Sequence, residues 1–274
     1  AGIKKGELDI LDGSPPCSSF STAGKREKGW GEVKKYSDKK QRTDDLFFEF
    51  ARILKGLQPK VFIAENVKGL TTGAAASLLG SEQEQLFGGH KDTIFHTLKN
   101  CGYQVRFEVL NSKHYGVPQG RQRTIFIGVR NDIKKPITYP KISNKIITLE
   151  DAFSDLKHTK EDLDDCNVEK YAIYNELIKL KPGEKSDKYF SLGKLDPKKV
   201  SYVLTQTAGN QGAASIAHWD NRKLTVKECI RIMSFPDDYY LGETYKNKVE
   251  RLGRAVPPLM MKAVAEHVYN TILK

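Results

Sequence analysis

The sequence lacks several features that would place it in common classes of protein. No apolar run approaches the roughly 18 residues that a membrane-spanning helix needs, and the first residues show no basic-then-apolar leader. Only four cysteines occur among 274 residues, and they form no C-x-x-C pair. This wide spacing argues against structural zinc and against a disulfide framework, so we expect reduced thiols, no metal and a cytoplasmic location.

Acidic residues are scarce relative to basic ones. Asp and Glu total 34 against 45 Lys and Arg, which gives a formal net charge of +11. Such an excess favours a polyanionic partner, and nucleic acid is the first candidate. With 39% hydrophobic residues, the chain can bury a substantial core in one large domain or two smaller ones.

Periodic patterns in the first half indicate an α/β fold. A short apolar strand is predicted over 7–13, an amphipathic helix over 43–57 and a continuous apolar strand over 60–67. The strand, helix, strand order is typical of a right-handed crossover between parallel strands. The further predicted elements of this block are a helix over 92–100 and strands over 103–110 and 124–130.

The pattern then weakens and sharpens again. The segment 71–89, rich in Gly, Ala and Ser, is interpreted as an insertion of unassigned role, and Lys-rich, Pro-punctuated sequence beginning near residue 131 suggests a second, smaller unit. Near the end, Thr225 and Glu228 form a capping box that predicts the start of a helix. A glycine turn at Gly253 is predicted before the last helix.

Cys17 is the cysteine with an unusual setting. It follows two prolines in GSPPCSSFS, and a stiff approach suits a thiol that must be aimed as a nucleophile. Cys101 and Cys229, by contrast, have the pattern of small buried residues. Because Cys17 and Glu65 each come directly after a predicted strand, they are expected to meet in one cleft at the carboxyl edge of the sheet.

A third group of polar residues enters the strand in VPQGRQRTIFIGV. Gln119, Arg121 and Arg123 alternate there, so their side chains are predicted to leave one face and converge on one target. A thiol, a carboxylic acid and paired guanidinium groups suit addition to an electron-poor ring, and carbon 6 of a pyrimidine fits that description. Each residue alone also has an ordinary structural interpretation, as a core thiol, a surface carboxylate or a solvated strand edge.

Five motifs in order make the chain resemble the cytosine-5 DNA methyltransferases of bacteria and phages. They are GSPPCSSFS, AENVKGL, YGVPQGRQRTIFIGVR, RKLTVKECIRIMSFPDDY and GRAVPP. The resemblance implies a partial Rossmann-like S-adenosylmethionine-dependent methyltransferase sheet with a smaller target-recognition domain. It divides the chain into a catalytic α/β domain over 1–130, a target-recognition region over 131–222 and closing helices over 223–274 that return to the catalytic domain.

The resemblance also implies roles for the matching residues. Cys17 would add to carbon 6 of a cytosine flipped out of double-stranded DNA, and a methyl group would pass from S-adenosylmethionine to carbon 5, as in restriction–modification. Glu65 would protonate ring nitrogen 3 or form a hydrogen bond with it. The other implied roles are Asn66 organising the Glu65 turn, Arg121 and Arg123 holding the base edge, Ser21 and Gln119 on DNA, and Pro16, Leu46 and Ala255 on the cofactor.

Two departures from the family pattern qualify this assignment. Arg254 stands where the family usually has Asn, and the Gly-rich cofactor turn has no counterpart before Leu11. We therefore expect an upstream segment of about 100 residues, or a partner subunit, to carry that motif and pair with the strand at 7–11. Two alternatives stay open: an RNA cytosine methyltransferase, and a non-catalytic DNA-binding fragment or subunit of a split methyltransferase.

Overall fold

The computed structural model of the chain describes residues 2–15, 34–36, 39–41, 46–71, 94–189, 192–209 and 216–274. Packing divides the chain into two compact units, each described by itself here. Unit 1 comprises Ala1–Leu110, Gln122–Tyr139 and His267–Lys274, and unit 2 comprises Asn111–Arg121 and Pro140–Glu266. The predicted boundaries at 130 and 222 concern functional regions and differ from the limits of these packed units. They stay a prediction.

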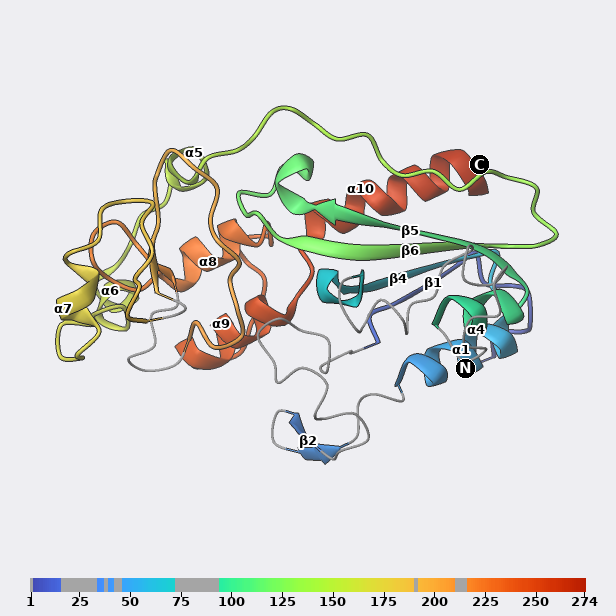
Figure 1. Cartoon of the computed structure of the whole chain (residues 1–274), viewed down its shortest axis with the longest axis horizontal. Helices are drawn as coiled ribbons and strands as arrows, with labels where there is room; N and C mark the ends of the chain where they lie inside the picture. Colours follow the sequence, from blue (N-terminus) through green and yellow to red (C-terminus); the bar gives the residue numbers. More distant parts are fainter. Residues whose placement is uncertain are drawn as a thin grey trace. The chain divides into compact units, whose positions relative to one another are not determined.

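A four-stranded sheet forms the centre of unit 1 (Figure 1). Its strands, in spatial order, are β1 (Ile10–Gly13), β4 (Val61–Val67), β6 (Gln122–Arg130) and β5 (Tyr103–Asn111). β1 and β4 run parallel, as predicted, whereas β6 is antiparallel to β4 and makes the sheet mixed. β4 is apolar almost throughout because it lies between two strands and is buried along nearly its whole length.

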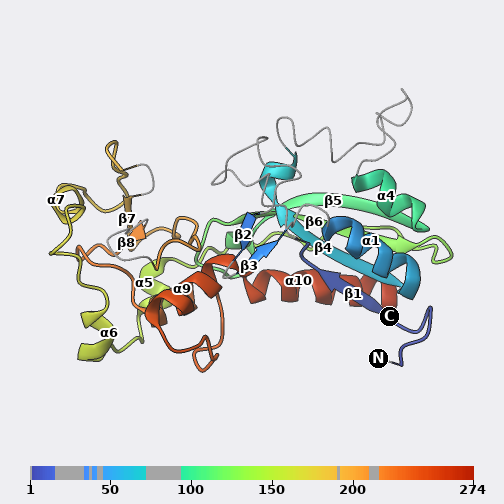
Figure 2. The same cartoon turned by 90° about the horizontal axis from the view of Figure 1, so that it is seen from below.

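Among the described residues, helices α1 (Leu46–Leu57) and α4 (Ile94–Asn100) pack against this sheet, which confirms both predicted helices (Figure 2). The core is aromatic at its centre. The ring of Phe62 lies 5.8 Å from that of Phe50 and 5.3 Å from that of Tyr103, both edge to face. Gly128 provides the space, because a Cβ there would lie only 1.9 Å from the Phe62 ring.

The remaining elements of the chain are short or belong to unit 2. The short ones are the antiparallel pair β2 (Lys34–Tyr36) and β3 (Lys39–Gln41), the 3₁₀ helices η2 (Lys68–Thr71) and η3 (Ser112–Tyr115), and the π-helix η4 (Tyr269–Leu273). Unit 2 also contains α5 (Leu149–Phe153), α6 (Lys160–Asp164), α7 (Tyr174–Leu177), α8 (Val226–Ile232), α9 (Tyr245–Arg254) and the parallel pair β7 (Gly193–Lys194) and β8 (Ile216–Ala217). α10 (Pro258–Val268) begins in unit 2 and ends in unit 1.

Unit 2 confirms one local prediction and overturns another. The capping box is present, since the Thr225 side chain accepts from the backbone of Glu228 and the Glu228 side chain accepts from the backbone of Thr225. The glycine turn is wrong, because Gly253 lies inside α9. Glycine is needed here because the backbone of Thr205 packs closely against the helix. A Cβ at position 253 would lie 2.3 Å from the carbonyl carbon of Thr205.

Candidate active site

Glu65, the predicted acid of the site, forms an ion pair between two neighbouring strands of unit 1. Glu65 lies on β4 and Arg123 on β6, and the Arg123 Nε atom is 2.8 Å from Oε1 of Glu65. Their side chains are only 10% and 14% exposed. β4 continues through Val67, which confirms the predicted strand over 60–67, and pairs there with Arg123; Glu65 therefore lies inside the strand, and the expectation that it comes directly after a strand is wrong.

Arg123 fixes the orientation of the Glu65 carboxyl group. Its Nη1 atom also donates to the carbonyl of Gln122 at 2.8 Å, so the guanidinium is held at two points. Burial lowers the pKa of Arg123, and the negative charge of Glu65 acts in the opposite direction. A carboxyl group in a protected position, paired with a guanidinium, is suited to hydrogen bonding with a polar ring.

Asn66 connects the same strand to the segment that leads to Cys17. Its Nδ2 atom donates to the carbonyl of Pro15 at 3.1 Å, and its Oδ1 atom accepts from the backbone of Val67 at 2.8 Å. The amide is buried, so both bonds are protected from water. Cys17 lies two residues beyond this anchor, and Pro16, Cys17 and Ser21 fall outside the described residues.

The alternating residues of VPQGRQR do not converge on one target. β6 begins at Gln122, so Gln119 and Arg121 precede the strand and belong to unit 2, while Arg123 belongs to unit 1. The Arg121 guanidinium donates to the carbonyls of Leu204 and Gly253, each at 3.0 Å. The expectation that Gln119 and Arg121 lie in the strand with Arg123 is therefore wrong, Arg123 is found on Glu65, and the roles of Gln119 and Arg121 at the DNA stay predictions.

Gln119 is fully buried rather than exposed to a ligand. Its Nε2 atom donates to the carbonyl of Ile232 at 3.4 Å, and its Oε1 atom accepts from the backbone of Leu204 at 3.3 Å. In this structure Gln119 and Arg121 support the backbone of unit 2, and nothing in it favours the predicted contact of Gln119 with DNA.

The two described residues that the sequence assigned to the cofactor lie in different units. Leu46 begins α1 and is 36% exposed, close in sequence to Phe48 and Ile53, which are also exposed. These three side chains give α1 apolar surface that packing within the described residues does not cover, and apolar surface fits an adenosyl group. Ala255 caps the C-terminus of α9 through its backbone N–H.

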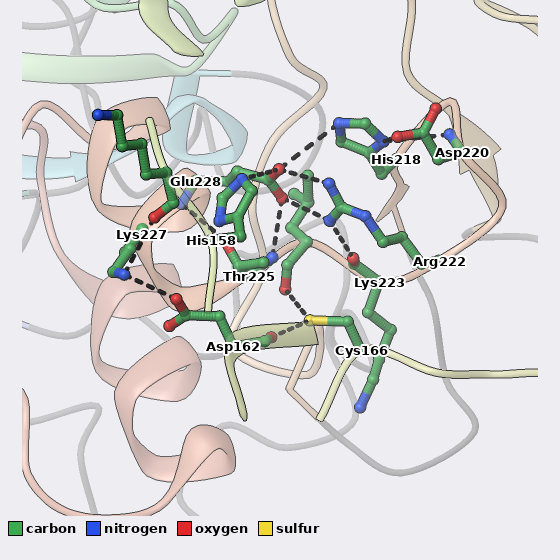
Figure 3. Close-up of polar contacts among 12 residues, drawn as sticks. His158, Asp162, Cys166, His218, Asp220, Arg222, Lys223, Thr225, Lys227 and Glu228 are labelled. Carbon is green, nitrogen blue, oxygen red and sulfur yellow. Dashed lines mark hydrogen bonds and ion pairs between the residues drawn. The ribbon is translucent and has the colours of Figure 1, made fainter. Parts of the chain in front are cut away.

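A second polar cluster, centred on Glu228, was not predicted as a whole (Figure 3). The carboxylate accepts two hydrogen bonds from Arg222, at 2.9 and 2.7 Å, and lies 3.2 Å from Nε2 of His158 and 3.5 Å from Nε2 of His218. The capping box identified Glu228, but not its partners, of which Arg222 and His218 lie in the preceding loop and His158 lies 70 positions earlier in the chain.

Charge balance in this cluster sets its pKa values. Burial alone would raise the pKa of Glu228, but the hydrogen bonds from Arg222 and its positive charge lower it below the ordinary value. Burial lowers the pKa of His218 to about 4, against the attraction of Glu228. The cluster therefore holds an ionised carboxylate, a guanidinium and a neutral His218 at neutral pH.

The surroundings of this cluster do not suggest a separate active site. Lys227 pairs with Asp162 at 2.7 Å, and the thiol of Cys166 donates to the carbonyls of Asp162 and Leu224. Across the described ranges, no group of three or more His, Cys, Asp or Glu side chains could hold a metal ion. Nor does any described helix have the length and apolar character needed to cross a membrane.

Comparison with known proteins places these observations in a family. Residues 2–270 match the family described as C-5 cytosine-specific DNA methylase. The chain is similar to the Type II methyltransferase M.Eco47II of Escherichia coli, with 31% identity over 293 residues, and to the Type II methyltransferase M.DdeI of Desulfomicrobium norvegicum, with 28% identity over 327 residues. Both alignments cover 97% of this chain, but only 65% of the first relative and 74% of the second.

A solved structure shows the same fold. The Dnmt2 methyltransferase of S. pombe matches with a TM-score of 0.60 and 16% sequence identity, over 96% of this chain and 77% of that one. At this identity the likeness concerns the fold alone. The predicted α/β methyltransferase fold class is thereby confirmed.

Proposed function

Because the chain belongs to the C-5 cytosine-specific DNA methylase family, we propose that it carries the base-binding and cysteine-addition centre of a DNA cytosine-5 methyltransferase. We infer that the whole enzyme is a methyltransferase that acts on DNA with S-adenosylmethionine as methyl donor, and the match to the C-5 cytosine-specific DNA methylase family supports this. It favours neither the RNA methyltransferase nor the non-catalytic alternative. What the chain contributes to that reaction is assigned below from its own residues.

The Glu65–Arg123 pair, next to the Asn66 anchor, is the observation that carries this proposal. The anchor ties the segment before Cys17 to the strand that bears Glu65, and that segment follows β1, which runs parallel to β4. The pair is buried enough to keep its geometry against competition from water. A carboxyl group held beside the segment that leads to a thiol suits attack on carbon 6 of a cytosine, and this supports the proposal.

The proposed reaction consists of an addition to the cytosine ring, a methyl transfer and an elimination. The Cys17 thiolate would form a C–S bond to carbon 6, and the electron pair of the 5,6 double bond would shift toward carbon 5, supported by a hydrogen bond or proton from Glu65 at ring nitrogen 3. S-adenosylmethionine, when bound, supplies the methyl group to carbon 5 and leaves as S-adenosylhomocysteine. A base then removes the proton from carbon 5, any proton on ring nitrogen 3 returns to Glu65, and the C–S bond breaks to release the thiolate and 5-methylcytosine.

Trapping on DNA that contains 5-fluorocytosine tests the assignment of Cys17. Fluorine at carbon 5 cannot leave as a proton does, so the holoenzyme with S-adenosylmethionine should remain covalently attached to the DNA. Cys17→Ala should abolish this denaturant-resistant adduct and retain DNA binding, whereas Cys101→Ala, at a buried cysteine far along the chain, should still form it. An adduct formed by the Cys17→Ala variant would overturn the assignment.

We also propose that the open edge of β1 receives the strand that carries the Gly-rich cofactor motif. Within the described residues β1 pairs only with β4, and Ile10 and Leu11 are half-buried, so a further strand would cover backbone and apolar groups together. Leu46 and the rest of the exposed α1 surface would then lie against the cofactor. Micromolar binding of S-adenosylmethionine by the 274-residue chain alone, measured by calorimetry, would refute this proposal.

Sequence recognition is assigned to the region 131–222. This region is rich in lysine and irregular in structure, as suits the presentation of phosphate-contacting and base-reading side chains. Exchange of the region with that of a relative should move the methylated site, as mapped by bisulfite sequencing. Retention of the host's site by the chimera would refute the assignment.

A further inference from the structure

A short polar turn in unit 2, Thr205 to Ala208, is fixed by more contacts than an exposed turn ordinarily has. The backbone N–H of Ala208 donates to the carbonyl of Thr205 at 3.1 Å, and the hydroxyls of Thr205 and Thr207 are 3.1 Å apart. Gln206 and Thr207, at the tip, are both exposed. Turns of this kind are ordinarily variable surface, so the contacts that fix this one need an explanation.

The turn is fixed first through its N-terminal side. The Arg121 guanidinium donates to the carbonyl of Leu204 and to that of Gly253, and the Gln119 side chain accepts from the backbone N–H of Leu204. Both side chains are almost completely buried. Burying a guanidinium is costly, and an apolar side chain would fill the same space, so what Arg121 adds is the exact position of two carbonyl groups.

The turn is fixed next by direct backbone packing on α9. A Cβ on Gly253 would lie 2.3 Å from the carbonyl carbon and 2.4 Å from the carbonyl oxygen of Thr205. On the other side of the turn, a Cβ on Gly209 would lie 3.0 Å from the carbonyl oxygen of Lys246. Gly253 therefore allows the turn to rest directly against the helix backbone, and Gly209 allows it to rest against the backbone of Lys246 and the side chain of Val249.

The tip residue Gln206 is fixed by Arg254, the residue that departs from the family pattern. Arg254 Nε donates to Oε1 of Gln206 at 3.0 Å, and its Nη2 atom is 2.5 Å from Oε1 of Glu250. Arginine can only donate, so the atom of Gln206 that faces it must be the amide oxygen. In the part of the chain that the structure describes, no hydrogen bond uses the amide nitrogen of Gln206.

We propose that the Thr205–Ala208 turn is a DNA-reading element and that Gln206 determines part of the recognised sequence. The inference rests on the proposed function, because only a DNA substrate gives the turn something to read. With its oxygen engaged by Arg254, Gln206 presents an N–H donor, which suits an acceptor on a base edge, such as O6 or N7 of guanine, and not the amino group of cytosine. Arg121, Gln119 and Arg254 act as positioning residues for this contact.

Methylation of a DNA library with randomised bases around cytosine tests the role of Gln206. Gln206→Ala should relax the preference at one base position by roughly 5- to 150-fold, the range for one good base contact, and leave the other positions unchanged. Gln206→Glu replaces the donor by an acceptor and should shift that position toward a base that presents an amino group. Gln104→Ala, an exposed glutamine on β5 in unit 1, is the matched control and should keep the parent profile.

The outcomes separate the two proposals. If both Gln206 variants methylate DNA with the parent's sequence profile, Gln206 is not a reading residue. If the parent holoenzyme methylates no DNA in the library, the proposed function itself is wrong.

A double-variant cycle tests the positioning role of Arg254. Arg254→Met keeps the aliphatic part of the side chain and removes the bond to Gln206, so KM for DNA and the preference at the same base position should change together. The double variant, with Gln206→Ala added, should show no further loss of preference, because the arginine acts through the glutamine. Losses of preference that add independently would overturn this role for Arg254.

Discussion

Replacement of Glu228 by Gln should be among the most destabilising single changes in unit 2. The carboxylate is 1% exposed, and it receives two hydrogen bonds from Arg222 and one from the backbone of Thr225. An amide in its place offers one acceptor oxygen and turns an NH₂ group toward guanidinium donors, while the positive charge of Arg222 loses its partner. Breaking a buried pair in this way costs about 3–5 kcal/mol.

Urea unfolding at neutral pH, followed by far-ultraviolet circular dichroism, measures this cost. Glu49→Gln is the matched control, because Glu49 pairs with Arg52 on the surface of α1, with side chains 53% and 71% exposed. An exposed pair of this kind should change stability by no more than about 0.5 kcal/mol. If Glu228→Gln unfolds within that margin of the parent protein, the cluster contributes far less than its geometry indicates.

Three further changes test other parts of the structure. Burial lowers the pKa of His218 to about 4, so the unfolded chain binds a proton at this residue more readily than the folded chain does. The free energy of unfolding should therefore be highest above pH 6.5 and fall as the pH decreases towards 4. Urea midpoints that stay constant over this range would contradict this expectation. Gly128→Ala should cost about 1–3 kcal/mol by displacing the Phe62 ring, and a midpoint equal to that of the parent would show that the ring moves freely. Glu65→Gln should slow single-turnover methylation by roughly 10²- to 10⁴-fold with DNA binding retained, and an unchanged rate would remove Glu65 from the chemistry.

Most of the fold could be predicted because the core elements carry strong periodic patterns. α1 buries Phe47, Phe50 and Leu54 at helical spacing, and β4 is apolar almost from end to end because a strand lies on each side of it. α9 was not predicted because most of its residues are polar and only a few are buried, which leaves a weak apolar pattern. In addition, Gly253 near its end has the local signature of a turn. Gly253 is required because the backbone of Thr205 packs against it. Thr205 is distant in the sequence, so no local pattern predicts this contact.

The candidate site was less predictable than the fold. Glu65 and Arg123 pair because β4 and β6 are adjacent and antiparallel, and this register was not evident from spacing. The partners of Glu228 come from segments as far away as His158. Arg254 could be recognised as a departure from the family pattern, but its partner Gln206 lies 48 positions earlier in the chain.

The motif that contains Arg121 and Arg123 shows why alternation alone was misleading. Alternate residues share a face only while the chain is a strand, and β6 starts at Gln122, between the two arginines. On one side of that start the buried guanidinium of Arg121 donates to two backbone carbonyls; on the other side the guanidinium of Arg123 binds the carboxylate of Glu65, the proposed acid. Because the two residues belong to different packing units, one short motif fixes both the frame of the proposed DNA-reading turn and the orientation of the proposed acid. A change in its spacing would therefore disturb recognition and chemistry together.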